Sequence, residues 1–219
     1  MTGLKKILLA AALALAPCSA VVAAAQTVKI AGGEMTELTG AQRTAALAAA
    51  SKALQEQKRL QGGFMQIGPD GSVAKGRFFL SRPGKIRFEY DLPTSMLVVA
   101  DGSTVAVQDN RLKTFNRAPL RSTPMYFFLK ENIDLAKDAK VIRVAKQSDT
   151  VAISMKDKTG QTDGVLTLLF VSSSYQLRQW LIEDGAGGVT RVALQDLRRP
   201  ETLDPKLFVL QPKKQPTRP

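Results

Sequence analysis

The chain has 219 residues, of which 44% are hydrophobic and 23% charged, and it carries a formal net charge of +12. This composition suits one large or two small globular domains, and the lack of histidine excludes serine–histidine catalytic triads and most zinc sites. The charge is compatible with contact to anionic membrane surfaces or with an evenly solvated surface, since no run of basic residues is dense enough to predict a binding stripe.

Residues 1–25 have the organisation of a secretory signal peptide. Two lysines precede an apolar run at residues 7–16, and the alanines at 23–25 supply small residues before Gln26. We expect cleavage before Gln26 and a mature protein outside the cytoplasm, because every apolar run is too short to span a bilayer. The alternative is a lipoprotein signal ending at Cys18, where proline occupies a position that favours a small residue. Cleavage before Gln26 removes this single cysteine and leaves no disulfide.

Residues 26–38 show no periodicity and predict a loose start of the mature chain. Residues 39–60 predict a helix with Thr39 as its N-cap and a stop at Gly62 and Gly63. Its apolar stripe, which predicts one buried face, consists of Leu47, Ala50, Ala53 and Leu54.

From Phe64 onward, short alternating segments separated by turn residues predict an antiparallel sheet that is closed or nearly closed on itself. The segment 78–90 predicts a hairpin around Pro83 and Gly84. A two-residue loop would leave one face half charged, whereas a three-residue loop leaves it apolar except for Arg82 at its rim. We therefore expect the three-residue loop, which pairs Arg82 with Ile86, Leu80 with Phe88 and Phe78 with Tyr90.

A second hairpin is predicted at Asp101 and Gly102. A two-residue turn there pairs Met96 with Val107 and Val98 with Val105. Because Leu97 and Val99 on the opposite face are also apolar, we expect both faces of this hairpin to be covered.

The strand pattern stops between residues 119 and 138, where prolines flank a short run, Met125 to Leu129, that predicts one or two helical turns. Strands are then expected at 139–146, 150–156, 164–172, 175–183 and 189–197, with an edge strand at 206–209. These segments predict one domain over residues 39–211, followed by a disordered tail at 212–219.

No motif for catalysis, phosphate binding or calcium binding is present in the sequence. Asp101 and Asp109 flank turns, where carboxylates normally accept hydrogen bonds from the backbone. A serine–lysine dyad stays open, but no residue pattern favours one. We therefore expect no enzyme activity, no cofactor, no metal site and no nucleic-acid partner.

Five segments, in this order, resemble the LolA family of periplasmic lipoprotein carriers. They are GGFMQ at 62–66, RPGKIRFEYDLP at 82–93, VVADGS at 98–103, TPMYFFL at 123–129 and LDPKLFVLQP at 203–212. The most specific positions are Phe64, Gln66, Arg82, Pro83, Phe88, Tyr90, Asp101 and Gly102. The chain departs from the family at Phe88, where tryptophan is frequent, and in VAVQD, which lacks the usual aromatic residues.

The resemblance implies an unclosed antiparallel β-barrel, or half-barrel, with a long N-terminal helix and a short helical lid over the concave apolar face. It implies a periplasmic monomer that takes acylated lipoproteins from an inner-membrane lipoprotein-releasing transporter to an outer-membrane acceptor. It also implies that Arg82 holds the lid through hydrogen bonds to lid backbone. The alternative places Arg82 outward at a solvated hairpin corner.

The lipid-binding cavity of such a carrier is expected to involve Phe78, Leu80, Ile86, Phe88, Tyr90, Met96, Val98, Met125, Phe128 and Leu129. The alternative is that these residues form an ordinary core. Two other functions stay open: a carrier of another lipid or a glycolipid, and a secreted scaffold or regulatory domain that binds a protein partner.

Overall fold

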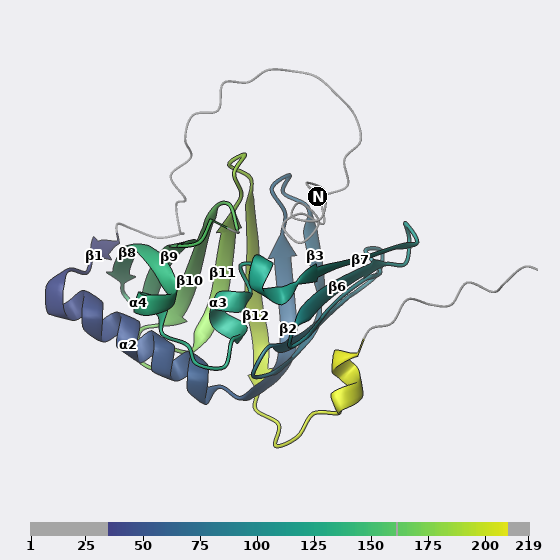
Figure 1. Cartoon of the computed structure of the whole chain (residues 1–219), viewed down its shortest axis with the longest axis horizontal. Coiled ribbons are helices and arrows are strands. Elements are labelled where there is room, and N and C mark those ends of the chain that lie inside the picture. The colour runs from purple at the N-terminus through teal and green to yellow at the C-terminus, as the bar shows by residue number, and fades with distance from the viewer. Residues whose placement is uncertain (1–34, 161, 210–219) are drawn as a thin grey trace, which may run out of the picture.

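A single antiparallel sheet dominates the computed structural model, which describes residues 35–160 and 162–209 (Figure 1). Within these residues the sheet has 12 strands in the order β1-β8-β9-β10-β11-β12-β2-β3-β4-β5-β6-β7. All neighbouring strands are antiparallel, and the end strands β1 and β7 do not pair with each other. The sheet is curved but not closed (Figure 1), so it forms a half-barrel, which confirms the expected fold class. The expected signal peptide, Cys18 and the tail at 212–219 lie outside the described residues.

The strands agree with the alternating segments to within a few residues, except at the start of the sheet. Their bounds are β1 Thr36–Glu37, β2 Arg59–Ile67, β3 Val73–Ser81, β4 Lys85–Tyr90, β5 Met96–Asp101, β6 Thr104–Asp109, β7 Thr114–Pro119, β8 Ala139–Gln147, β9 Thr150–Asp157, β10 Val165–Val171, β11 Leu177–Glu183 and β12 Val189–Arg198. The short β1 falls in a segment expected to be loose, and it is held by pairing of Thr36 with Lys146 of β8.

Helix α2 (Gly40–Glu56) has Thr39 at its N-cap and buries the predicted stripe through Leu47, Ala50 and Leu54. It ends earlier than expected, because Gly62 and Gly63 belong to β2 rather than to a helix stop. A Cβ on Gly62 would lie 2.4 Å from the backbone oxygen of Gln195 in β12. Glycine is therefore required at this position by the close approach of two strands.

The register of the β3–β4 hairpin differs from the expected one by two residues. Leu80 pairs with Ile86 and Phe78 with Phe88, so the loop consists of residues 82–84 and Arg82 is part of it. The three-residue length and the positive φ of Gly84, +72°, are as expected. Because a shift of two residues preserves the side-chain alternation, the same residues still face the concave side.

The β5–β6 hairpin shows the same kind of difference. Val98 pairs with Val107 and Met96 with Asp109, so the two-residue turn is formed by Gly102 and Ser103. The physical reason is Asp101, whose carboxylate Oδ1 accepts hydrogen bonds from the backbone N–H groups of Ser103 and Thr104 at 2.8 Å. This Asx turn places Asp101 before the turn instead of inside it.

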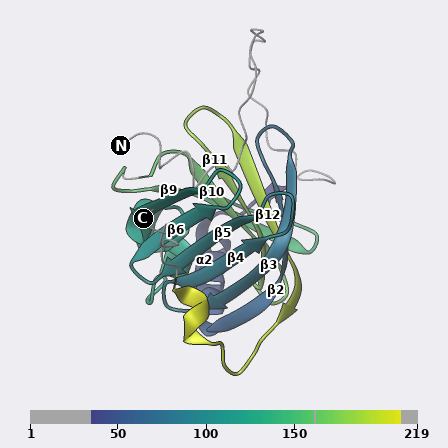
Figure 2. The same cartoon turned by 90° about the vertical axis from the view of Figure 1, so that its right-hand side faces the viewer.

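The outer face of this hairpin is covered by a short helix near the end of the described chain. Residues 206–209 were expected to form an edge strand, but Pro205–Phe208 form the 3-10 helix η2, which lies across β4 and β5 (Figure 2). Phe208 is buried, and so are Val99 and Ala106 on the outward side of β5 and β6. Arg87 fixes the helix by donating a hydrogen bond from Nη1 to the backbone oxygen of Leu207, 3.0 Å away.

The interruption of the sheet between β7 and β8 forms the lid segment, defined here as residues 120–138. It contains η1 (Leu120–Ser122), α3 (Tyr126–Leu129) and α4 (Leu135–Asp138). Together with α2, these short helices lie against the concave side of the half-barrel (Figure 1). The helical turns predicted at Met125 to Leu129 are thus present, with α3 beginning at Tyr126.

Candidate functional site

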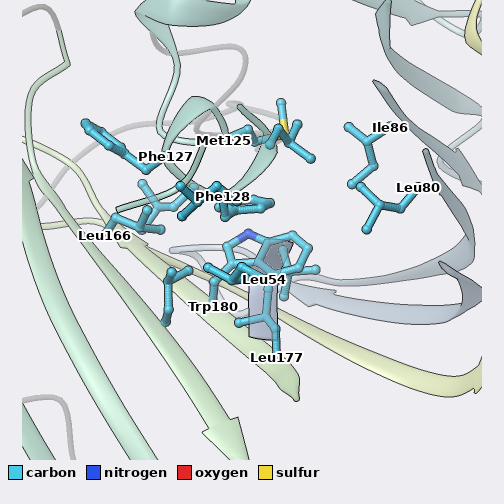
Figure 3. Close-up of a cluster of buried hydrophobic side chains, with 14 of the residues drawn as sticks. Leu54, Leu80, Ile86, Met125, Phe127, Phe128, Leu166, Leu177 and Trp180 are labelled. Atoms are coloured by element: carbon cyan, nitrogen blue, oxygen red, sulfur yellow. The ribbon is translucent and has the colours of Figure 1, made fainter. Parts of the chain in front are cut away.

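A chain of aromatic rings crosses the concave face from the β2–β4 wall to the lid segment. The Phe64 ring makes edge contacts with Phe88 and Tyr90 at centroid distances of 5.0 and 4.9 Å. Phe88 is also 6.0 Å from Trp180 of β11, which in turn lies 5.3 Å from Phe128 of α3 (Figure 3). Trp180, the only tryptophan of the chain, therefore connects the wall of the half-barrel to its lid.

A small cavity lies next to Trp180, between the lid segment and the β3–β4 hairpin. Its volume is about 20 Å³, roughly the space that one water molecule requires. Side chains from the C-cap of α2, the sheet, the β3–β4 loop and the lid segment line it: Gln57, Leu60, Phe78, Leu80, Arg82, Ile86, Phe128, Leu177, Trp180 and Leu194. Figure 3 shows Leu80 and Ile86 on one side, opposite Trp180 and Phe128. The protein's own side chains thus fill most of the space between these two groups of residues.

Some of the residues predicted for a cavity line this one, and others do not. Phe78, Leu80, Ile86 and Phe128 are in its wall. The remaining predicted residues belong to the surrounding core, where Phe88, Met96, Val98, Met125 and Leu129 are buried and Tyr90 is partly buried.

Five lining residues were not predicted: Gln57, Leu60, Leu177, Trp180 and Leu194. The sequence pattern places Gln57 and Leu60 in the helix expected over 39–60. Leu177 and Trp180 have odd spacing and would face opposite sides of a regular strand. A β-bulge resolves this, because Phe170 pairs with Leu177 while Leu169 pairs with Gln179, which leaves Arg178 as an extra residue. The bulge places Leu177 and Trp180 on the same face.

Arg82 lies at the polar corner of the cavity, at the C-terminal end of α2. Its Nε donates a hydrogen bond to the backbone oxygen of Gln57 at 3.1 Å, and its backbone N–H donates to the oxygen of Lys58 at 2.8 Å. The expectation that Arg82 bonds to the lid backbone is not met by these contacts, because its place in the loop directs it toward the end of α2. Nor does it stand at a fully solvated corner, because its side chain is partly buried and lines the cavity. This burial lowers the pKa of Arg82 to about 9.

The hairpin loop does contact the lid segment, through glycine instead of arginine. The backbone N–H of Gly84 donates to the oxygen of Leu129 at 2.7 Å. A Cβ on Gly84 would lie 2.6 Å from the Cα of Gly102, so only glycine fits between the two hairpin loops.

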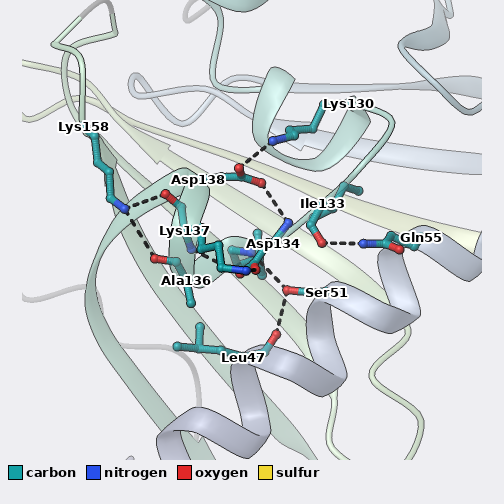
Figure 4. Close-up of polar contacts among 11 residues, drawn as sticks. Leu47, Ser51, Gln55, Lys130, Ile133, Asp134, Ala136, Lys137, Asp138 and Lys158 are labelled. Atoms are coloured by element: carbon teal, nitrogen blue, oxygen red, sulfur yellow. Dashed lines mark hydrogen bonds and ion pairs between the residues drawn. The ribbon is translucent and has the colours of Figure 1, made fainter.

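The other end of the lid segment is attached to α2 by two side chains (Figure 4). Gln55 donates from Nε2 to the backbone oxygen of Ile133 at 2.6 Å. Ser51 Oγ donates to the backbone oxygen of Leu47 and accepts from the backbone N–H of Leu135 at 3.0 Å. These contacts bind the segment around α4 to α2 by polar groups, whereas α3 is held mainly by apolar contacts.

Charged groups fix the segment internally and to the β9–β10 connection. Lys130 and Asp138 form a largely buried ion pair at 2.5 Å, and Asp138 also accepts from the N–H of Asp134. Lys158 donates from Nζ to the backbone oxygen of Lys137 at 2.5 Å (Figure 4). The segment is therefore an ordered cover with attachment points at both ends.

The site offers burial of apolar groups and little else chemically. Within the described residues, no three histidine, cysteine, aspartate or glutamate side chains are placed to hold a metal ion. In the same part of the chain, no helix combines the length and the apolar character needed to cross a membrane. An apolar cavity beneath an attached cover is suited to holding a hydrophobic group out of water.

Comparison with known proteins identifies counterparts by sequence. Residues 55–211 match the family model for outer membrane lipoprotein carrier protein LolA. An outer-membrane lipoprotein carrier protein from Chromobacterium violaceum is 31% identical, with 64% of this chain and 69% of that protein covered. A protein of the same name from Methylococcus capsulatus is 28% identical, with 73% and 80% covered.

Solved structures with similarity to this chain are more distant. An uncharacterised conserved protein from Thermus thermophilus has a TM-score of 0.48 at 12% identity, covering 79% of this chain and 96% of that one. A LolA superfamily protein from Nitrosomonas europaea has a TM-score of 0.45 at 11% identity, with 76% and 97% covered.

Proposed function

The chain belongs to the LolA family of outer membrane lipoprotein carrier proteins, and we propose that it carries acylated lipoproteins through the periplasm with their acyl chains inside the half-barrel. The route runs from an inner-membrane lipoprotein-releasing transporter to an outer-membrane acceptor, and the carrier acts as a monomer without a catalytic step. The single observation that carries this proposal is the apolar cavity between the concave face and the lid segment.

Transfer of a lipid through water needs such a cover because the exposed chain is energetically unfavourable. Moving about 15 methylenes from an apolar site into water costs roughly 12 kcal/mol, at about 0.8 kcal/mol for each methylene. Unassisted diffusion of the acylated protein between two membranes is therefore negligible.

The cavity must enlarge before it can accept an acyl chain. Ligand pockets usually measure about 300–1,000 Å³, whereas this cavity measures about 20 Å³. Phe128 is the one lid-segment residue in its wall and is held by the ring contact with Trp180. Displacement of α3 opens the space between Trp180 and the β3–β4 hairpin, and the acyl chain then replaces the contacts that Phe128 made.

Quenching of Trp180 fluorescence by a brominated acyl chain tests the proposal. Bromine quenches tryptophan only at short range, and Trp180 is the sole tryptophan and lies in the cavity wall. We expect a mature protein mixed with a dibrominated acyl glycerol thioether peptide to lose Trp180 emission in a saturable way, and the non-brominated analogue to reverse the loss.

The variant Leu80→Glu provides the specificity control. Leu80 lies in the cavity wall, so a carboxylate there should abolish quenching because an acyl chain cannot desolvate it. Asp163→Glu, in the exposed β9–β10 connection, should leave quenching unchanged. Absence of quenching in the folded wild-type protein would contradict the proposal and favour a half-barrel with a permanently filled interior that binds a protein partner.

A further inference from the structure

Two buried polar atoms without a hydrogen-bond partner lie in the wall of the otherwise apolar cavity. In the described part of the chain, Gln57 Oε1 and Arg82 Nη1 are the buried side-chain nitrogen and oxygen atoms that lack a partner. Gln57 is 5% exposed. Both side chains line the cavity, and the other eight lining residues are apolar. An unpartnered buried polar group is unfavourable by about 1–3 kcal/mol, so a pair of them at one site requires an explanation.

The two side chains are held where they are by backbone contacts. The Nε of Arg82 donates to the backbone oxygen of Gln57, and the N–H of Gln57 donates to the oxygen of Ala53 at the end of α2. Gln57 accepts from Arg82 through its main-chain oxygen, and its side-chain Oε1 has no donor among the described residues. Arg82 stays protonated at neutral pH, because its pKa of about 9 lies above it. The corner thus combines a fixed cationic donor with a neutral acceptor.

We propose that this Gln57–Arg82 corner is a subsite for the secondary amide of an N-linked acyl chain. This inference rests on the proposed function, and it adds the chemical group that the cavity recognises. Because the C=O and the N–H of a trans amide point in opposite directions, the amide lies between the two side chains. Its oxygen accepts from Arg82 Nη1, and its N–H donates to Gln57 Oε1. The chain attached to the amide carbonyl lies along Leu60, Leu177 and Leu194.

An ester does not fit the same corner equally well. An ester supplies an oxygen for Arg82 but has no N–H, so Gln57 Oε1 would stay buried without a donor. A site built around a donor and an acceptor discriminates against a ligand that lacks one of the two partners. Recognition of the amide distinguishes chains linked to an amino group from chains linked to glycerol.

The test compares two probes that differ only in their linkage, which is an amide N–H in one and an ester oxygen in the other. N-ethyl dodecanamide and ethyl dodecanoate have the same acyl chain and the same ethyl group. Their affinities for the mature protein are measured by titration of Trp180 fluorescence. We expect the amide to bind about tenfold more tightly, the factor that corresponds to one satisfied buried hydrogen bond.

Replacement of the acceptor should remove this preference. Gln57→Met retains the length of the side chain and the backbone contact to Arg82, and we expect it to bring the two affinities within about twofold of each other. Arg82→Met should weaken the binding of both probes, since the carbonyl oxygen of each accepts a hydrogen bond from Arg82 Nη1. Gln61→Met, on the opposite face of β2 from Leu60, is the matched control and should keep the tenfold ratio. Circular dichroism confirms that each variant is folded.

Three results would overturn the inference. Equal affinities in the wild-type protein, tighter binding of the ester, or an unchanged ratio in folded Gln57→Met would each show that the corner does not recognise an amide. In those cases the probes still bind, so the proposed carrier function stands. If neither probe binds the wild-type protein, the proposed function fails together with the inference.

Discussion

Two polar side chains on the concave face, Tyr90 and Arg82, differ in how their polar atoms are satisfied. Tyr90 lies among aromatic rings, and its hydroxyl donates to Gln66 Oε1 at 2.7 Å. Burial raises the pKa of Tyr90, because the phenolate would lose its hydration there. Arg82 is the opposite case, with one satisfied nitrogen and one unpartnered nitrogen. We therefore expect Tyr90 to contribute to stability, whereas the unpartnered nitrogen of Arg82 is the donor of the subsite proposed above.

The variant Tyr90→Phe tests the stabilising role and its pH dependence. At pH 7 we expect a loss of about 1 kcal/mol, the usual contribution of one hydrogen bond. Because the pKa of Tyr90 is higher in the folded state, its contribution is complete below the unfolded pKa of about 10 and is lost as pH rises further. Urea unfolding between pH 7 and 11 should therefore show a shallower alkaline decline in Tyr90→Phe than in the wild type. Tyr126→Phe, at an exposed tyrosine, is the control, and equal slopes in both variants would refute the prediction.

At the scale of elements, the lid segment is attached differently at its two ends. Next to α3, one backbone hydrogen bond from Gly84 and the ring contact of Phe128 hold it. Next to α4, Ser51 and Gln55 of α2 bind it through side-chain hydrogen bonds. Breaking α3 away exposes few polar groups, whereas releasing α4 leaves buried backbone groups unpaired. Under the proposed function, we therefore expect α3 to move when an acyl chain enters and α4 to stay with α2.

Ser51→Ala should weaken the α4 attachment specifically. The variant leaves the buried N–H of Leu135 without an acceptor, which costs about 1–3 kcal/mol. Hydrogen exchange followed by mass spectrometry should show faster exchange in peptides that cover residues 130–138. Thr44→Ala is the matched control, because Thr44 makes the same i to i−4 hydrogen bond on an exposed part of α2. If exchange in 130–138 is unchanged in Ser51→Ala, the Ser51 contact does not restrain α4.

At the scale of the whole molecule, the unclosed sheet leaves one side of the interior uncovered, and the helices pack over that side. Because β1 and β7 do not pair, α2 and the lid segment supply the remaining wall of the barrel. The described side chains fill much of the resulting interior, and the small cavity at Trp180 lies within it. Under the proposed function, stability and ligand uptake therefore compete, since side chains that fill the interior must be displaced when an acyl chain enters.

Phe128→Ala should show this competition directly. Truncation of a buried phenylalanine usually destabilises a protein by about 3–5 kcal/mol, and Phe128 is 2% exposed. The same change enlarges the cavity, so we expect lower stability in urea together with faster and tighter binding of a hydrophobic dye. Phe127→Ala removes a buried ring from the same helix that does not line the cavity, and should lower stability without improving dye binding. Weaker dye binding by folded Phe128→Ala would contradict the competition.

Local patterns in the sequence determined which side of each strand faces the interior. Alternation placed Phe78, Leu80, Ile86 and Phe88 on one face, and all four are buried there. Both hairpin registers differ by two residues from those expected, and such a shift leaves the alternation intact. The segments that resemble the LolA family also predicted the half-barrel and its cover.

The tertiary structure alone decided which residues meet at the cavity. The bulge at Arg178 brings Leu177 and Trp180 to the same face, and pairing of β12 with β2 brings Leu194 beside them. The start of β2 at Arg59 places Gln57 at the end of α2, within reach of Arg82, which is 25 residues later in the chain. The alternation of side chains is a property of the local backbone. Contacts between strands and loops that are distant in the sequence depend instead on the packing of the entire sheet. For that reason the sequence alone predicted the faces of the strands, and the polar corner of the cavity emerged only from the folded molecule.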